Sequence, residues 1–188
     1  MTGKALFFLA NGFEELEAVA PIDVLRRAGV EVVLCAVTPD GRLSVSGSHG
    51  LRIEAECLPA QLPPPEECML TYFPGGMPGA TNLAAAADVL DYTRRVHAAG
   101  GLCCAICAAP LALDAAGLLA DADYTCYPGV EARIRNGRYT GRYIQRSGRI
   151  LTACGPAAAL DFALEILRAA GMSAAAGAIA GGMQLRGK

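Results

Sequence analysis

Cys107 is the residue of this sequence best placed to act as a nucleophile. It follows an apolar run from Leu102 to Ile106 that is typical of a buried strand, and it precedes the small residues Ala108 and Ala109. A strand that turns directly into a helix can present such a thiol at the tip of the turn. Nearby backbone N–H groups and the positive end of the helix dipole lower the pKa of a thiol in this position. We therefore expect a thiolate at Cys107, with a buried, inert cysteine as the alternative.

A cluster of carboxyl side chains, Glu14, Glu15 and Glu17, lies in the first turn of the helix expected over residues 14–28. Helix capping alone accounts for acidic residues in such a turn. Glu17 differs because its neighbours on both sides are apolar, so that burial would raise its pKa. A protonated Glu17 could donate a hydrogen bond to the sulfur of Cys107 and stabilise the anion.

The glycines Gly75 and Gly76 follow the strand expected over residues 68–73. A glycine turn at the carboxyl edge of a parallel sheet can leave backbone N–H groups pointing into the functional crevice, where they would form an oxyanion hole. An ordinary turn is the alternative. The sequence contains neither G-x-G-x-x-G nor G-K-[ST], so it gives no support for phosphate binding.

The sequence holds two histidines, His49 and His97. His49 lies in a loop and is a candidate for the pocket, whereas His97 falls on the surface of an expected helix. The residue after Cys107 is Ala108, so no histidine adjoins the nucleophile. This argues against a peptidase that uses a Cys-His-acid triad.

Composition limits the class of protein. The chain has 188 residues, of which 53% are hydrophobic, and a formal net charge of −2. These values fit one globular domain over residues 1–188 and exclude the basic surface that nucleic-acid binding needs. No apolar run reaches the length of a membrane span, about 18 to 20 residues. We expect a small-molecule substrate, with neither nucleic acid nor membrane as a partner.

The eight cysteines are expected to be free thiols, because a domain of this size with a good apolar supply needs no disulfide framework. A cytoplasmic location follows. The C-x-x-C spacing of Cys104 and Cys107 lacks the second ligand pair that a zinc site requires, so no metal is expected.

Short apolar runs alternate with amphipathic stretches, which is typical of an α/β fold whose parallel sheet is covered by helices on both faces. We expect strands over residues 5–10, 31–37, 68–73, 102–106 and 124–127, and a strand pair over 139–151. Residues 42–56 are expected to be extended or to form a hairpin. Helices are expected over residues 14–28, 82–99, 108–119 and from 155 to 170.

Four segments resemble the ThiJ/PfpI family, in particular its deglycase branch. They are N-G-F-E-E-L-E-A-V, F-P-G-G-M-P-G-A-T-N-L, A-I-C-A-A-P and C-G-P-A-A-A-L-D-F-A-L. The four segments occur in the family's order and spacing, and the similarity covers nearly the whole chain. It implies a flavodoxin-like three-layer sandwich with a mostly parallel central sheet and a nucleophile turn, and it implies a homodimer.

The resemblance also implies roles for particular residues. Cys107 would be an oxidation-sensitive nucleophile, Glu17 its protonated hydrogen-bond partner, and Gly76 and Ala108 its backbone donors. Many members of the deglycase branch have a pocket histidine where this sequence has Tyr127. A phenol with a pKa of about 10 cannot replace imidazole as a base at neutral pH, although it can donate a hydrogen bond.

Two functions use this one site. The first is an enzyme in which Cys107 attacks a small reactive dicarbonyl, such as methylglyoxal, or its adducts, without any cofactor. That enzyme would be a glyoxalase independent of glutathione, or a deglycase. The second is a redox sensor or stress-response chaperone in which Cys107 is oxidised to a sulfinic acid without turnover.

Overall fold

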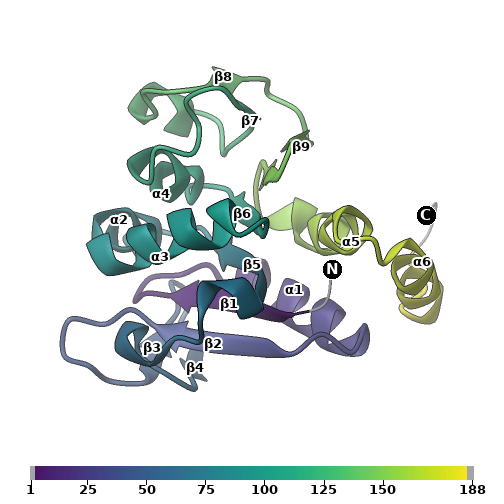
Figure 1. The fold of residues 1–188 in the computed structure, drawn as a ribbon, viewed down its shortest axis with the longest axis horizontal. Helices are drawn as coiled ribbons and strands as arrows, with labels where there is room; N and C mark the ends of the chain where they lie inside the picture. Colours follow the sequence, from purple (N-terminus) through teal and green to yellow (C-terminus); the bar gives the residue numbers. More distant parts are fainter. Residues whose placement is uncertain (1–2, 186–188) are drawn as a thin grey trace.

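A six-stranded sheet runs through the middle of the molecule (Figure 1). The computed structural model describes residues 3–185. The strands lie in the order β2 (Val32–Ala36), β1 (Lys4–Leu9), β5 (Cys68–Phe73), β6 (Leu102–Ile106), β10 (Ile150–Ala153) and β9 (Ile144–Ser147). Every neighbouring pair is parallel except β10 and β9, which form an antiparallel hairpin. The α/β class and the mostly parallel sheet are thus confirmed.

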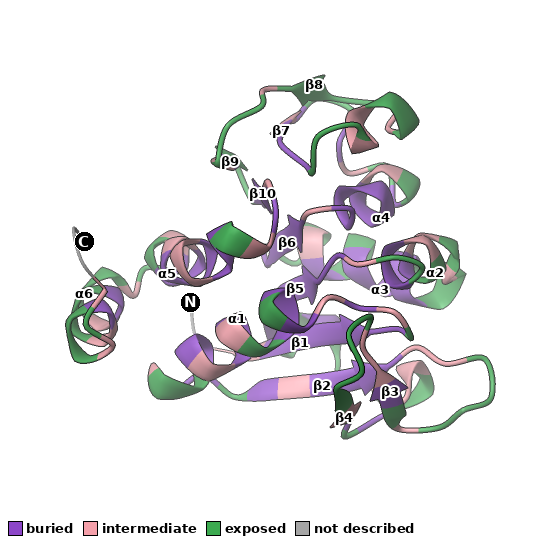
Figure 2. Cartoon of the chain, turned by 180° about the vertical axis from the view of Figure 1, so that it is seen from behind, coloured by how far each residue is buried: buried purple, intermediate pink, exposed green. Residues whose placement is uncertain are grey.

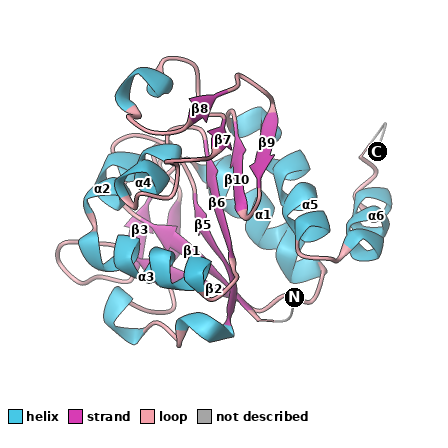
Figure 3. Ribbon diagram, turned by 45° about the horizontal axis from the view of Figure 1, so that its top comes forward, coloured by secondary structure: helices cyan, strands magenta, loops and turns pink. Residues whose placement is uncertain are grey.

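Helices cover both faces of this sheet (Figure 3). One face carries α1 (Glu15–Arg27) and α5 (Ala159–Ala169), and α6 (Ser173–Gly182) packs on the outer side of α5. The other face carries α2 (Gly79–Ala85), α3 (Ala87–Ala98) and α4 (Pro110–Ala115). Within residues 3–185, no helix combines the length and the apolar character that crossing a bilayer demands.

Two small paired elements stand outside the main sheet. The hairpin of β3 (Ser44–Ser46) and β4 (Arg52–Glu54) forms within residues 42–56, which were expected to be extended or to form a hairpin. Strands β7 (Asp123–Tyr124) and β8 (Arg138–Tyr139) pair in parallel beyond α4. Short 3₁₀ turns cover Pro59–Gln61, Pro65–Glu67, Val130–Arg133 and Pro156–Ala158.

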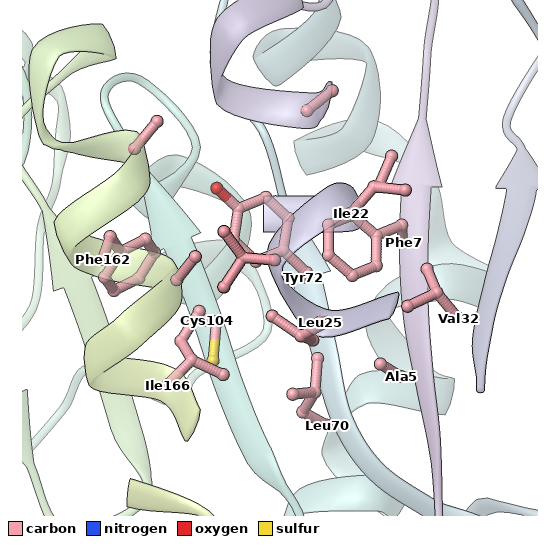
Figure 4. Packing of buried hydrophobic residues seen from close by; sticks show 14 of the residues in the cluster. Ala5, Phe7, Ile22, Leu25, Val32, Leu70, Tyr72, Cys104, Phe162 and Ile166 are labelled. Carbon is pink, nitrogen blue, oxygen red and sulfur yellow. The ribbon is translucent and has the colours of Figure 1, made fainter. Parts of the chain in front are cut away.

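The sheet separates two apolar clusters, because successive side chains of each strand point to opposite faces. Figure 4 shows the cluster between the sheet and helices α1 and α5, in which Phe7 stacks on Tyr72 with ring centroids 4.5 Å apart. The other cluster includes Phe8 and Phe73 and lies under α3 and α4. Figure 2 shows that the central strands are buried throughout while the outer faces of the helices are exposed. Burial on both faces explains why these strands are apolar without alternation.

The structure corrects three expected elements. The single helix expected over residues 82–99 is divided between α2 and α3, because Ala86 leaves the helical region with φ −82° and ψ 88°. The helix expected over 108–119 is only six residues long and ends at Ala115. The last helix, α6, was not expected, since its run of small residues has little amphipathic pattern.

The carboxyl ends of β5, β6 and β10 lie side by side. Phe73 pairs with Ala105, and Ile106 at the end of β6 pairs with Ala153 at the end of β10. The segments that follow these strands therefore emerge at one edge of the sheet, which is where open parallel sheets place their functional crevice.

Candidate active site

Cys107 occupies a sharp turn between β6 and α4. Its φ of 62° lies in the left-handed region, and Gln184 is the only other non-glycine residue with positive φ in the described chain. Both backbone groups of Cys107 are satisfied, because its N–H donates to Ala153 O at 2.9 Å and its carbonyl accepts from Tyr127 N at 2.9 Å. Bonds from two separate segments hold a conformation that costs of order 1–3 kcal/mol. The nucleophile turn expected from the sequence is present.

Glu17 brings a carboxyl group to this turn from the first turn of α1, and its side chain is fully buried. One carboxyl oxygen, Oε2, accepts the Gly75 N–H at 2.7 Å. The other, Oε1, is buried and finds no nitrogen or oxygen donor among the described residues. The Cys107 thiol is the remaining group that hydrogen-bonds with this carboxyl. The predicted contact between Glu17 and Cys107 is therefore formed.

Gly75 allows the acid and the thiol to approach each other. A methyl group added at its Cα would lie 2.6 Å from Glu17 Oε2 and 2.7 Å from Cys107 Cβ. Real Cβ contacts do not reach such values, so only glycine fits between the two side chains. The glycine turn that follows β5 thus has a specific role, which is to leave room for the carboxyl–thiol pair.

Backbone N–H groups face the sulfur from two sides. Gly76 and Ala108 both donate hydrogen bonds to Cys107, and each of them lowers the pKa of the thiol. Gly76 has a φ of 86°, and a side chain there would collide with Gly12 O and Glu14 N. These are the two N–H groups expected from the sequence, and their use as an oxyanion hole stays a prediction.

The protonation of this pair differs in one respect from the expectation. Burial raises the pKa of Glu17 to about 7, as expected. The pKa of Cys107, however, is raised to about 12 rather than lowered, first by burial and then by the charge and hydrogen bond of Glu17. The expected effect of the helix start is outweighed, since α4 begins only at Pro110 and a buried anion loses its hydration.

Between about pH 7 and pH 12 the pair consequently holds one proton, and the order of the two pKa values favours its position on the sulfur of Cys107. When the proton lies on Glu17, the sulfur is an anion held by the N–H groups of Gly76 and Ala108. When it lies on Cys107, the carboxylate is held by Gly75 N–H. Attack by the sulfur therefore requires that the proton of Cys107 first moves to Glu17.

The carboxylate of Glu15, by contrast, is engaged with the β3–β4 hairpin. It accepts the backbone N–H of His49 at 2.6 Å, and its Oε2 lies 2.8 Å from His49 Nδ1. These bonds raise the pKa of His49. One side-chain oxygen or nitrogen from each of Glu14, Glu15 and His49 lies within 4.8 Å of the others, so these three residues could together bind a cation. The structure thus associates His49 with Glu15 and not with the Cys107–Glu17 pair.

Tyr127 lies next to the turn through its main chain, since its N–H donates to Cys107 O. Its side chain is 51% exposed, and its ring lies 3.3 Å from the position that a Cβ on Gly155 would take. The phenol is therefore at the surface beside the nucleophile, on the side formed by the segment after β10.

Two further residues support the pair: Tyr72, which was not identified from the sequence, and Glu14, whose capping role was expected. Tyr72 lies inside β5, and its hydroxyl donates to Glu17 O at 2.8 Å from a fully buried position. Glu14 caps α1 by accepting the Glu17 N–H at 2.8 Å, and its own N–H donates to Gly75 O at 2.9 Å. A tyrosine within an otherwise apolar strand was the available signal, because a buried hydroxyl needs a partner.

The fold and the site together define a class of protein: a flavodoxin-like α/β sandwich with a cysteine at the strand–helix turn and a buried acid beside it. Comparison with known proteins then gives the family. The DJ-1/PfpI family model matches residues 3–169. This chain belongs to the DJ-1/PfpI family, as the four sequence segments indicated.

Individual relatives agree with this assignment. The chain is 35% identical over 173 residues to the Parkinson disease protein 7 homolog of Danio rerio, covering 89% of each chain. It is 30% identical over 156 residues to the glutathione-independent glyoxalase DJR-1.2 of Caenorhabditis elegans, covering 82% of this chain and 81% of that one. The solved structure of oxidized Toxoplasma gondii DJ-1 superimposes with a TM-score of 0.89 at 32% identity, covering 98% of this chain and 100% of that one.

The role of Gly75 predicts the effect of a single methyl group. Gly75→Ala should force Glu17 and Cys107 apart, and since the charge and hydrogen bond of Glu17 raise the pKa of Cys107, the thiol should then ionise more readily and be alkylated faster. The measurement is the rate at which iodoacetamide alkylates Cys107, followed by peptide mass spectrometry. Gly177→Ala, in the open part of α6, is the control and should react like the unmodified protein. An unchanged rate in Gly75→Ala would show that the pair does not govern the thiol.

The buried acid predicts a dependence of stability on pH. The folded pKa of Glu17, about 7, lies above its ordinary value of 4.5, so its favourable contribution is complete below pH 4.5 and is lost as the pH rises through 7. Relative to the unmodified protein, Glu17→Gln should therefore gain about 3 kcal/mol of unfolding free energy between acidic conditions and about pH 8. Urea denaturation at several pH values measures this gain. The exposed substitution Glu54→Gln should show no such trend, and the same flat result for Glu17→Gln would contradict the assignment.

Proposed function

We propose that this chain is a cysteine-dependent stress-response enzyme that acts on reactive dicarbonyls such as methylglyoxal, or on their adducts with amines and thiols. The observation that carries the proposal is the Cys107 turn, where one thiol meets a buried acid and two backbone N–H donors. The glyoxalase activity printed for the Caenorhabditis elegans relative supports it.

The first step uses the tautomer in which Glu17 holds the shared proton. The sulfur anion of Cys107 adds to the aldehyde carbon of methylglyoxal, and the C=O bond opens to an oxyanion. The N–H groups of Gly76 and Ala108 stabilise this charge, which develops only as the new bond forms. Glu17 then delivers its proton to the oxygen, giving a neutral hemithioacetal and a carboxylate.

The second step uses Glu17 as a base. The carboxylate removes the hydrogen of the former aldehyde carbon and returns a proton to the neighbouring carbon, so that one carbon is oxidised to a thioester while the other is reduced to an alcohol. Water then cleaves the thioester, which releases lactate and restores the thiol. The net reaction consumes one water and needs no external oxidant or reductant, so no cofactor takes part.

The same addition applies to a deglycase. In a hemithioacetal or aminocarbinol formed from methylglyoxal, the carbinol O–H gives its proton to the leaving thiol or amine as the C–S or C–N bond breaks and the aldehyde C=O re-forms, and the sulfur of Cys107 then adds to that aldehyde carbon. The site therefore accommodates both free dicarbonyls and their early adducts, and the small residues around Cys107 leave access for either.

Removal of the nucleophile tests the enzyme directly. Cys107→Ala should form no lactate from methylglyoxal above the uncatalysed rate, and Glu17→Gln should lose most of the activity because its amide cannot shuttle a proton. Lactate is measured enzymatically after the protein is removed. Cys154→Ser changes the other partly exposed thiol and serves as the matched control, which should keep full activity. Lactate formation by Cys107→Ala at the unmodified rate would overturn the proposal.

The alternative function is a redox sensor or chaperone that uses the same thiol. It is favoured by the half-buried position of Cys107 beside two N–H donors, which would also hold a sulfinate, and by the oxidized state named for the Toxoplasma gondii structure. After mild peroxide treatment, mass spectrometry should find two added oxygens on Cys107 selectively. Oxygen spread evenly over the exposed and buried cysteines would contradict a sensor role.

We also propose that the protein is a homodimer that associates through α1. Two large apolar side chains on this helix face solvent, Leu16 at 62% exposure and Val19 at 45%. A second copy would bury both of them. Leu16→Asp should convert the dimer into a monomer in light-scattering measurements, whereas Leu51→Asp, on the hairpin, is the control for an exposed leucine elsewhere. A monomeric unmodified protein would overturn this proposal.

We further propose that the protein is located in the cytoplasm. All eight cysteines are free thiols, and six of them are buried. Reduced thiols in this number are typical of a compartment kept reducing by glutathione and thioredoxin.

A further inference from the structure

Two cysteines far from Cys107 face each other at the edge of the sheet. Residues 55–57 run alongside β2, where Ala36 N–H donates to Cys57 O at 2.9 Å and Cys57 N–H donates to Leu34 O at 3.2 Å. These bonds pair Cys35 directly with Cys57 in a parallel bridge. Adjacent strands lie about 4.8 Å apart, which falls within the Cα separation of about 4.4–6.8 Å that a disulfide requires.

The two side chains also point to the same face. Both belong to the apolar cluster under α3 and α4, and each thiol is close enough to the other to affect its pKa. Each thiol has a backbone carbonyl as a hydrogen-bond partner, Ala36 O at 3.9 Å for Cys35 and Leu34 O at 3.8 Å for Cys57. The two sulfurs are therefore neighbours. The backbone bridge between Cys35 and Cys57 already holds the two chain segments side by side, as a disulfide between these residues requires.

We propose that Cys35 and Cys57 are a second redox site, which forms a reversible intramolecular disulfide when the protein meets a peroxide. This site is independent of Cys107 and of the chemistry proposed for it.

The reaction balances with the peroxide as the only oxidant. The sulfur of Cys57 attacks one peroxide oxygen, the O–O bond breaks, and a sulfenic acid forms while water or an alcohol leaves. The sulfur of Cys35 then attacks the sulfenic sulfur, the S–O bond breaks, and a second water leaves with the thiol proton. The two thiols together lose two electrons and two protons.

The order of the two cysteines follows from their exposure. Cys57 is 9% exposed, whereas Cys35 is fully buried. The residues after Cys57, Leu58 and Pro59, line a surface cavity of about 540 Å³. A small oxidant or a reducing thiol therefore reaches Cys57 first, and Cys35 acts from inside as the resolving thiol. Burial raises the pKa of Cys57 above its ordinary value, and the neighbouring Cys35 thiol partly offsets this effect.

The other buried cysteines lack such a partner. Cys103 and Cys104 are consecutive in β6, so they point to opposite faces and belong to different clusters. Cys68 is bound to Tyr92 OH at 2.9 Å, and Cys126 contacts Glu131 Oε2 at 3.9 Å. Among the described residues, Cys35 and Cys57 are the cysteines that share a bridge.

Oxidation of the pair would close the loop that contains the β3–β4 hairpin. This hairpin reaches the start of α1, because Gly12 N–H donates to Ser46 O at 2.8 Å and Ser48 N–H donates to Phe13 O at 2.8 Å. A disulfide across a loop of this length restricts the unfolded chain and should raise Tm by about 5–10 °C.

The test uses Cys107→Ala, in which oxidation of the nucleophile cannot interfere. After treatment with hydrogen peroxide, peptide mapping without reduction should find Cys35 and Cys57 in one linked peptide that has lost two hydrogens. Tm should rise by the amount given above, and dithiothreitol should reverse both changes. Because this variant has no nucleophile, failure of the glyoxalase or sensor proposals would not affect the result.

Two further variants in the same background serve as controls. Cys107→Ala with Cys57→Ser should give neither the linked peptide nor the rise in Tm, and Cys107→Ala with Cys126→Ser should give both. The proposal is overturned if Cys35 and Cys57 remain thiols after treatment, or if Cys57 is oxidised to a sulfinic acid without a link. The peptide map of Cys107→Ala decides the question even if the Cys57→Ser variant does not fold.

Discussion

The hydrogen bond between the Glu17 carboxyl and the Cys107 thiol is the interaction on which the candidate chemistry depends. Burial makes either anion costly, so the pair keeps one proton between about pH 7 and pH 12. In the proposed chemistry this proton has two uses: on the oxygen of Glu17 it leaves a nucleophilic sulfur, and after its transfer to the substrate it leaves a carboxylate base. An exposed thiol or an exposed carboxyl alone would have neither property.

The rest of the fold holds these two groups at bonding distance. Parallel strands end side by side, so the turn after β6 and the glycines after β5 meet at one edge of the sheet. Cys107 remains in the left-handed region because Ala153 and Tyr127 bind its backbone. Gly75 donates to the carboxyl and leaves the space that any larger residue would fill. Precise placement thus comes from main-chain bonds, which do not depend on flexible side chains.

The same geometry connects the enzyme and sensor functions. N–H groups that stabilise an oxyanion on a carbonyl adduct can also stabilise the oxygens of an oxidised sulfur, since both are anions next to the same atom. The outcome then depends on which electrophile arrives first, a carbonyl carbon or a peroxide oxygen. Beside the outer strand β2, the proposed redox pair of Cys35 and Cys57 would respond only to the oxidant, because their buried sulfurs leave no room for a carbonyl substrate.

The sequence by itself determined the α/β class, the strand that leads to Cys107 and the unusual environment of Glu17. It could do so because the spacing of apolar residues along the chain indicates which face of a strand or helix is buried. It also predicted the contact between these two residues through a family resemblance. Tertiary structure alone decided that α4 begins too late to lower the pKa of Cys107, that His49 binds Glu15, and that Cys57 lies beside Cys35. Each of these depends on which distant segments pack together, and a local sequence pattern does not specify that packing.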